Sequence, residues 1–315
     1  MFQKVAVIVP VKGIPYYFVK CMASLLALDY PDYELIVVDD GLEPGILSAL
    51  SKFSEKVRIL KSESRGPSFA RNLAASNTDA GLIAFTDSDC VLERSWLKEL
   101  VKGLEQFPEA VSCGGIQKSP DDASKFQKDV FQLFHKTGRV CEYMRSASVD
   151  QVTEVDHNAS CNVIYKRDIF LKEGGFFEGL WPGEDVELDC RLRKKGLKIV
   201  FNPKAVVYHY RPESLKKVYQ MMLRYGMVQA FLIKKYGIFR KVQLVPFILL
   251  FFIMIMLLTG IKGLTVGLIL LIWGLLILVA YFLSLRAVII FLITIVSWNA
   301  GFLKGLFMKS PLAKK

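Results

Sequence analysis

The feature that most constrains the fold of this chain is a C-terminal stretch without acidic residues. Residues 242–315 contain no Asp or Glu and only six of the 41 Lys and Arg residues. The preceding 241 residues hold all 30 acidic residues and the other 35 basic ones. The whole chain is 52% hydrophobic, and a long apolar stretch without acidic residues is typical of a membrane-embedded segment. We therefore expect one soluble domain followed by a membrane-embedded tail.

The predicted membrane region covers residues 242–303 and is followed by a basic tail at 304–315. A spanning helix needs about 20 apolar residues, which only the second of three apolar runs reaches unaided. Basic residues favour the cytosolic side of a membrane, and they occur both in the juxtamembrane segment 227–241 and in the tail. Three crossings would place these two segments on opposite sides. Two or three crossings thus remain open. The three runs are 244–258, 264–283 and 287–302.

The expected location is the cell membrane, with several crossings and the soluble domain in the cytoplasm. The first apolar run, Val5–Val9, has only the length of a strand and ends at Pro10, which does not fit a signal peptide. The six cysteines form no CxxC pair, so we expect reduced thiols and no zinc site.

The soluble part alternates between short apolar runs rich in Val, Ile and Leu and segments with helical spacing. This alternation predicts an open α/β sheet, in which ligands bind beyond the carboxyl ends of the strands. Neither GxGxxG nor GxxxxGK[ST] occurs, which argues against a dinucleotide dehydrogenase and a P-loop ATPase. The predicted strands are 4–10, 34–38, 57–60 and 81–85, and the predicted helices are 15–28, 45–53, 68–76 and 95–107.

Two acidic residues, Asp87 and Asp89, follow the fourth predicted strand with one residue between them. In extended backbone this spacing points both carboxylates to the same side. Such a pair suits Mg²⁺ or Mn²⁺, completed by substrate phosphates and water. Aspartate is also common in turns, so the position after a buried strand is what favours the metal site.

Further polar residues lie near the expected ligand edge, and each has an ordinary structural alternative. Asp39 and Asp40 follow the second strand, where we expect one to form a turn and the other to accept a hydrogen bond from a base or ribose. Arg71 lies one turn into a helix that begins after Gly66, so it is either an anion-binding group or a solvated cation.

Two more candidates lie in the second half of the soluble part. Glu184 and Asp185 begin a predicted helix, where acidic residues often serve as caps, but a carboxylate there could accept a proton from an attacking hydroxyl. His209 follows an apolar strand and is either a third metal ligand or an ordinary polar side chain.

Seven segments, in the same order, resemble membrane-associated members of glycosyltransferase family 2, which have the GT-A fold. The resemblance covers about residues 4–226, which we take as the catalytic domain, 1–226. The segments are VPVKG (9–13), SLLALDYPDYELIVVDDG (24–41), GPSFARNLA (66–74), FTDSDC (85–90), NVIYKRDIF (162–170), GGFFEGLWPGEDVELDCRLRKKG (174–196) and VVYHYRPESLKKVYQMMLRYG (206–226).

The resemblance implies inverting transfer of one sugar from a nucleotide-diphosphate sugar, with Mg²⁺ or Mn²⁺ as cofactor. Asp185 would be the general base with Glu184 beside it, while Asp87 and Asp89 would hold the metal with help from His209. Acceptor-side positions would be Asn162, Gly175 and Trp181. The donor would contact Pro10, Val11, Asp39, Asp40, Gly66, Arg71, Asp87 and Ser88.

The expected acceptor is lipid-linked, either a polyprenyl or dolichyl phosphate or a lipid-linked saccharide, and membrane lipids are expected partners. The QxxRW sequence of processive synthases is replaced by QMMLRY at 220–225, which favours a one-sugar transferase over a polysaccharide synthase. A catalytically silent membrane-anchored subunit is the other alternative, although all the acidic candidates are present. No basic-aromatic platform indicates nucleic-acid binding.

Overall fold

The computed structural model describes residues 3–13, 16–42, 57–141, 151–260, 263, 265–267, 270, 272–274, 277 and 284–308. The chain forms two compact units. The first combines Met1–Asp122 with Ser146–Tyr210, and the second combines Ala123–Arg145 with Arg211–Pro311. The expected catalytic domain over 1–226 stays a prediction.

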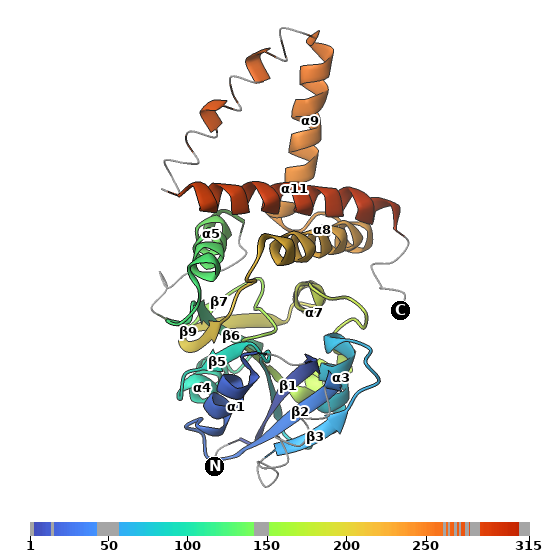
Figure 1. The fold of residues 1–315 in the computed structure, drawn as a ribbon. Helices are drawn as coiled ribbons and strands as arrows, with labels where there is room; N and C mark the ends of the chain where they lie inside the picture. The colour runs from blue at the N-terminus through green and yellow to red at the C-terminus, as the bar shows by residue number, and fades with distance from the viewer. Residues whose placement is uncertain are drawn as a thin grey trace. The chain divides into compact units, whose positions relative to one another are not determined.

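The first unit contains the predicted α/β sheet, and all four predicted strands are present (Figure 1). The central apolar residues of β1, β2 and β4 are buried on both faces, as expected for parallel strands covered by helices, whereas Ile59 of the edge strand β3 is 37% exposed. The parallel order along the sheet is β3-β2-β1-β4. The strands are β1 (Val5–Gly13), β2 (Tyr33–Leu42), β3 (Val57–Lys61) and β4 (Leu82–Phe85).

The sheet continues beyond β4 with strands that run in mixed directions. The order after β4 is β8-β6-β9-β5, and β7 pairs with β9. The antiparallel pairing of β5 with β9 places Cys90 opposite His209. These strands are β5 (Cys90–Leu92), β6 (Ala110–Lys118), β7 (Thr153–Glu154), β8 (Val163–Lys166) and β9 (Lys198–His209).

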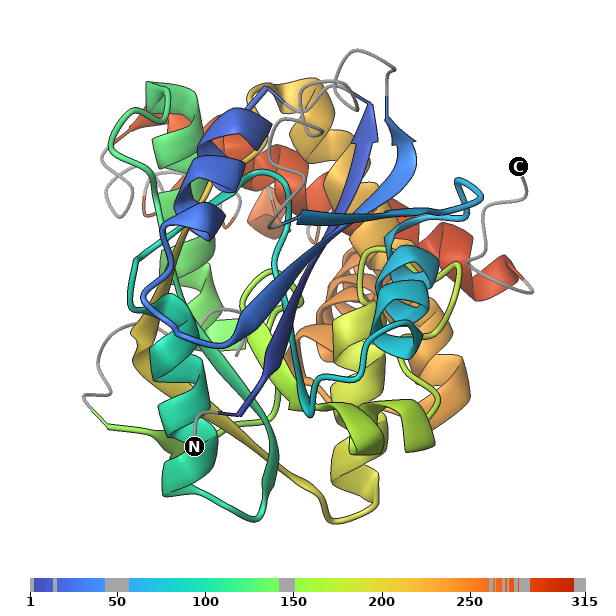
Figure 2. The ribbon, with the colours of Figure 1, turned by 90° about the horizontal axis from the view of Figure 1, so that it is seen from below.

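Helices cover both faces of this sheet, as Figure 2 shows. Alternate residues of β1 point to opposite faces, so Val7 and Val9 pack with α1 and α4, whereas Ala6 and Ile8 pack with α3, α6 and α7. The predicted helix at 45–53 lies outside the described residues. The helices are α1 (Phe18–Leu26), α3 (Pro67–Ser76), α4 (Trp96–Gln106), α6 (Arg167–Lys172) and α7 (Glu184–Lys194).

The second unit is helical, and its central contact is the close packing of α8 against α11 (Figure 1). A Cβ atom on Gly226 of α8 would lie 2.0 Å from the carbonyl oxygen of Trp298, and one on Gly301 of α11 would lie 2.0 Å from that of Leu223. Glycine is therefore what lets the two backbones approach. The elements are α5 (Lys125–Cys141), α8 (Leu215–Tyr236), the short 3₁₀ helix η1 (Lys241–Leu244), α9 (Val245–Leu258) and α11 (Leu285–Phe307).

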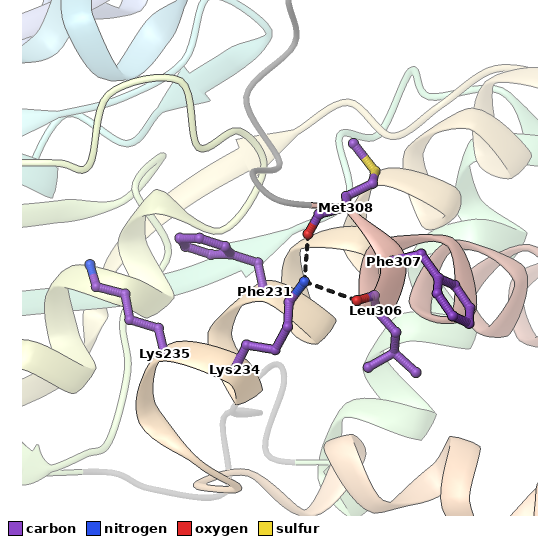
Figure 3. A pocket seen from close by; sticks show the side chains of 6 residues that line it. All are labelled: Phe231, Lys234, Lys235, Leu306, Phe307 and Met308. Atoms are coloured by element: carbon purple, nitrogen blue, oxygen red, sulfur yellow. Dashed lines mark hydrogen bonds between the residues drawn. The ribbon is translucent and has the colours of Figure 1, made fainter.

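The C-terminal end of α11 is capped by a lysine of α8. Lys234 Nζ donates hydrogen bonds to the carbonyl oxygens of Gly305, Leu306 and Met308, at 2.9, 3.2 and 2.6 Å. Figure 3 shows Lys234 in an open pocket, which is lined by Phe231 and Lys235 of α8 and by residues 306–308 at the end of α11. A cation at the last carbonyls of a helix compensates for their unsatisfied hydrogen bonds and for the helix dipole.

Among the described residues, α11 is the one helix both long and apolar enough to cross a membrane. It has 23 residues, whereas α9 has 14 and is too short to span alone. The predicted middle run, 264–283, and the tail beyond residue 308 lie largely outside the described residues. The described part of the chain therefore supports one candidate crossing and does not support the multi-pass arrangement expected from the sequence.

Candidate functional site

The two acidic residues after β4 lie together with His209, as the metal-site hypothesis requires. One ligand atom each from Asp87, Asp89 and His209 lies within 4.8 Å of the others. His209 Nε2 is 3.4 Å from Asp89 Oδ1, a proximity created by the β5–β9 pairing, in which the Tyr210 N–H also donates to the Asp89 carbonyl oxygen. His209 ends β9 instead of following it.

The chemistry of this set fits a divalent cation. Two carboxylates supply the hard oxygen ligands that Mg²⁺ and Mn²⁺ prefer, and the imidazole of His209 is compatible with Mn²⁺. The side chains of Asp87 and Asp89 are 30% and 43% exposed, so the cluster is open to solvent and substrate. His209 Nδ1 faces Gln117 Oε1 at 3.1 Å, which orients the ring as in many metal-binding histidines.

Arg71 is buried, which contradicts the interpretation of it as a solvated helix cation. Its side chain is 1% exposed and contacts two carboxylates: Nη1 donates to Glu184 Oε1 at 2.7 Å, and Nη2 donates to Asp87 Oδ1 at 2.5 Å. Burial lowers the pKa of the guanidinium, but the two carboxylates outweigh this effect and raise it overall. Arg71 therefore stays charged and links the metal-site candidate to the start of α7.

Glu184 is a buried carboxyl with an incomplete set of partners. Oε1 accepts hydrogen bonds from Arg71 and from Ser160 Oγ, the latter at 3.1 Å, whereas Oε2 is buried without a partner. Burial and the neighbouring Asp185 raise the pKa of Glu184 to about 7, although Arg71 acts in the opposite direction. Glu184 therefore exchanges its proton near neutral pH, and it is too enclosed to touch a substrate.

Asp185, the expected general base, lies beside Glu184 in the first turn of α7. Its side chain is 14% exposed. Oδ2 accepts the backbone N–H of Ser160 at 3.0 Å, and Oδ1 accepts that of Val186 at 2.8 Å. These two hydrogen bonds fix the carboxylate while leaving part of it accessible, which is the requirement for a proton acceptor.

A histidine to which the sequence assigned no role lies next to Asp185. His157 Nδ1 is 2.8 Å from Oδ2 of the fully buried Asp189, and His157 Nε2 is 4.0 Å from Asp185 Oδ2. The available signal was the spacing of Asp185 and Asp189, which are four residues apart and share one face of a helix. Nothing in the sequence places the loop before β8 against that face.

The residues expected near the nucleotide gather at the carboxyl ends of β1 and β2. Val11 is the register partner of Asp39. Asp39 is 6% exposed and its Oδ1 accepts the N–H groups of Gly41 and Leu42, so Asp39 forms the expected turn. Asp40, at 2% exposed, accepts hydrogen bonds from Ser62 Oγ and the Gly66 N–H.

Both aspartates therefore have structural partners, and Asp40 holds the loop that precedes α3. Pro10 is buried next to Val11, and Ser88 is half-buried between the two metal-ligand candidates. Of the two aspartates, Asp39 is slightly less buried, at 6% exposed against 2% for Asp40.

The expected acceptor-side residues are not brought together. Asn162 is 1% exposed, and its amide is fully used inside the fold: Oδ1 accepts from Trp96 Nε1 at 2.7 Å, and Nδ2 donates to two backbone carbonyls. Gly175 has φ +63° in the turn that follows α6, and a Cβ there would lie 2.5 Å from Asn72 Oδ1. The structure thus gives Asn162 and Gly175 packing roles inside the fold, whereas Trp181 is 49% exposed and accessible, and the acceptor-side assignment stays a prediction.

Several curated proteins are similar in sequence to this chain. One is the dolichyl N-acetyl-alpha-D-glucosaminyl phosphate 3-beta-D-2,3-diacetamido-2,3-dideoxy-beta-D-glucuronosyltransferase of Methanococcus voltae, 23% identical over 81% of this chain and 82% of its own. Another is the glucosyl-dolichyl phosphate glucuronosyltransferase of Haloferax volcanii, 26% identical over 67% and 72%. Some relatives are much longer: the chain spans 34% of the glycosyltransferase GlyA of Streptococcus pneumoniae, at 24% identity over 72% of the chain.

A solved structure shares the fold. The mannosyltransferase PcManGT of Pyrobaculum calidifontis, in complex with GDP-Man and Mn²⁺, matches with a TM-score of 0.69 and 16% identity over 98% of this chain and 88% of its own. The sheet is thus that of the GT-A glycosyltransferases, as the sequence predicts. The model of the family "Glycosyl transferase family 2" matches residues 6–172, more than half of the chain. The chain therefore belongs to glycosyl transferase family 2, and it is a glycosyltransferase.

Proposed function

We propose that this protein transfers one sugar from a nucleoside-diphosphate sugar to a lipid-linked saccharide at a membrane, with inversion at the anomeric carbon. The observation that carries the proposal is the continuous set of contacts from the metal-ligand candidates through Arg71 to α7. Asp87 contacts Arg71, Arg71 contacts Glu184, and Asp185 follows directly in the chain. A diphosphate-binding group and a proton acceptor are thereby held in one rigid network.

On the donor side, Asp87, Asp89 and His209 would hold Mg²⁺ or Mn²⁺, and a bound cation stabilises the charge that grows on a leaving diphosphate. Asp39 would contact the nucleoside from the end of β2, beside Val11. Arg71 acts indirectly, because both of its Nη atoms are taken up by carboxylates. The solved relative PcManGT, with GDP-Man and Mn²⁺, supports this type of donor.

On the acceptor side, the names of the relatives from Methanococcus voltae and Haloferax volcanii support a sugar hydroxyl on a dolichyl-phosphate carrier, because each names a glycosylated dolichyl phosphate as its acceptor. A hydroxyl, unlike an anionic phosphate, needs a base. Asp185 would accept the hydroxyl proton while the oxygen attacks the anomeric carbon and the bond to the diphosphate breaks. Attack from the face opposite the leaving group inverts the configuration.

The decisive test measures nucleotide release by the purified full-length protein in detergent. We would combine a panel of nucleotide sugars with Mn²⁺ or Mg²⁺ and glycosylated or bare polyprenyl phosphates. Asp185→Asn keeps the size of the base but removes its function, and should lower kcat by about 10²–10⁴-fold. Asp89→Asn should raise the metal concentration needed for half-maximal activity. The matched control is Asp168→Asn, an aspartate whose side chain is 93% exposed on α6.

Activity that requires metal, a glycosylated lipid and Asp185 would support the proposal in full. Activity on the bare polyprenyl phosphate that survives Asp185→Asn would replace the proposed acceptor by the phosphate itself. Long products from one acceptor would indicate a processive synthase. Failure to bind or turn over any donor would favour a catalytically silent membrane-anchored subunit.

A further inference from the structure

A carboxylate, an imidazole and a second carboxylate form a row beneath the proposed base. Asp189 is 0% exposed, and its Oδ2 lies 2.8 Å from His157 Nδ1. The same Oδ2 accepts the Asn158 N–H at 2.8 Å, and Oδ1 accepts the hydroxyl of Tyr165 at 3.1 Å. The other ring nitrogen of His157 faces Asp185 Oδ2 at 4.0 Å. Hydrogen bonds therefore fix both carboxylates and one side of the ring, and the contact between His157 and Asp185 is the one that is longer than a hydrogen bond.

These partners determine how the imidazole is used. Because Asp189 accepts hydrogen bonds at both oxygens, the neutral ring carries its proton on Nδ1 and leaves the lone pair of Nε2 toward Asp185. Burial raises the pKa of Asp189, and the contact with His157 counters that rise. Positive charge on the ring is therefore favourable for the buried carboxylate.

A carboxylate is in general a weaker base than an imidazole, so a histidine behind a proton-accepting aspartate can take the proton on from it. Proton transfer is most efficient when the accepting group ionises near the working pH, and histidine, near 6.5, is the side chain that meets this condition. The geometry places such a group one step behind Asp185.

We propose that His157 is a positioning residue that receives the acceptor proton from Asp185. This inference rests on the proposed function, in which Asp185 is the base. The acceptor O–H bond breaks as the proton moves to Asp185 Oδ2, and the proton then passes to His157 Nε2 as the contact closes or through one water molecule. The resulting imidazolium is stabilised by Asp189, and His157, with its side chain 15% exposed, returns the proton to solvent.

Other ionisable groups lie on the row's own elements and on those next to it. The two carboxylates of the row attract a positive charge on the ring, and Arg71, the cation in contact with Glu184, is paired with Glu184 and Asp87. The groups and their elements are Glu184, Asp185 and Asp189 on α7, Tyr165 on β8, Arg71 on α3, and the Asp156–Arg193 ion pair at 2.8 Å.

The test is the dependence of kcat on pH, measured between about pH 5 and 9 at saturating donor, metal and glycosylated lipid. The wild type should lose activity on the acid side, because an imidazole that already carries both protons cannot accept another. His157→Asn keeps a donor for Asp189 but cannot take a proton, so it should lower kcat by about 10-fold or more and abolish this acid-side decrease. Asp189→Asn should shift the decrease to lower pH, because the imidazolium loses its counter-charge.

Two controls separate this role from a structural one. Tyr165→Phe removes the other side-chain contact of Asp189 and should leave the acid-side decrease in place, whatever happens to kcat. His209→Asn identifies any pH dependence that arises at the metal-ligand candidates. A uniform loss of activity for His157→Asn at every pH would overturn the inference while leaving the proposed function intact. Full activity of Asp185→Asn would instead overturn the assignment of the base.

Discussion

At the scale of single residues, the charged centre depends on Arg71. Its guanidinium is 1% exposed and contacts both Asp87 and Glu184. Arg71→Met would leave two buried or half-buried acids without their counter-charge, and breaking a buried ion pair costs about 3–5 kcal/mol. We expect a clearly lower urea midpoint for the variant in detergent.

The matched control is Arg65→Met, because Arg65 is 44% exposed and pairs with Glu178 at the surface. Exposed pairs contribute about 0–1 kcal/mol, so this change should leave the urea midpoint nearly unchanged. Equal effects of the two substitutions would show that Arg71 has no special structural role.

Glu184 gives a second prediction at this scale. Its pKa is raised from the ordinary 4.5 to about 7, mainly by burial. The folded state therefore holds the proton more tightly than the unfolded state, so Glu184 favours folding below about pH 4.5 and this contribution is lost as pH rises through 7. The loss is on the order of 3 kcal/mol. Glu184→Gln should flatten the dependence of the urea midpoint on pH over this range, and an unchanged slope would contradict the assignment.

The sequence predicted those site residues whose geometry is local. Asp87 and Asp89 are close in sequence, although a turn in which the Cys90 N–H donates to the Asp87 carbonyl oxygen brings them together, and not the extended backbone that we expected. Asp185 lies at the predicted helix start. His157 could not be found this way, because its contact with Asp189 depends on how a loop packs against α7. The burial of Asn162 could not be predicted for the same reason, because its partner Trp96 is 66 residues away in the sequence.

At the scale of elements, the close crossing of α8 and α11 rests on glycine. A Cβ at Gly301 would meet the backbone of Leu223 at 2.0 Å, so Gly301→Ala must push the helices apart. Overpacking of this kind costs about 1–3 kcal/mol. The matched control is Gly274→Ala, because nothing lies within 4 Å of the added methyl group.

We expect Gly301→Ala to lower the thermal unfolding temperature in detergent, whereas Gly274→Ala should leave it unchanged or raise it slightly, since alanine is the better helix former. If both variants unfold at the wild-type temperature, the crossing tolerates a wider separation than the glycine contacts indicate.

The elements themselves were predictable where strand and helix alternate along the chain. Each of the parallel strands β1 to β4 coincides with a local apolar run, and the sequence predicted all four. In the mixed half, the strand predicted before His209 is the end of β9. β5 and β7 were not predicted, because they have only three and two residues and gain their pairing from β9, far along the chain. The helix α8 continues past residue 226 to Tyr236, so a boundary drawn from sequence resemblance falls inside an element.

At the scale of the whole molecule, positive charge and apolar surface are two different ways of binding a membrane. The chain carries a formal charge of +11, which favours anionic lipid surfaces. On α11, one face packs within the helical unit, while a row of apolar residues at spacings of three, four and seven stays exposed. The exposed row includes Leu285, Ile289, Leu292, Val296 and Leu303.

If the apolar row carries the association, membranes from expressing cells should keep the protein through a wash in about 1 M salt, where the Debye length is about 3 Å and surface charges are screened. Val296→Lys should reduce the fraction retained, because a charge at the centre of a spanning helix costs about 2.5–3.5 kcal/mol. Val19→Lys makes the same change at a 78% exposed position of α1 and should have no effect. Release of the wild type by salt alone would mean that its positive charge, and not α11, holds it to the membrane.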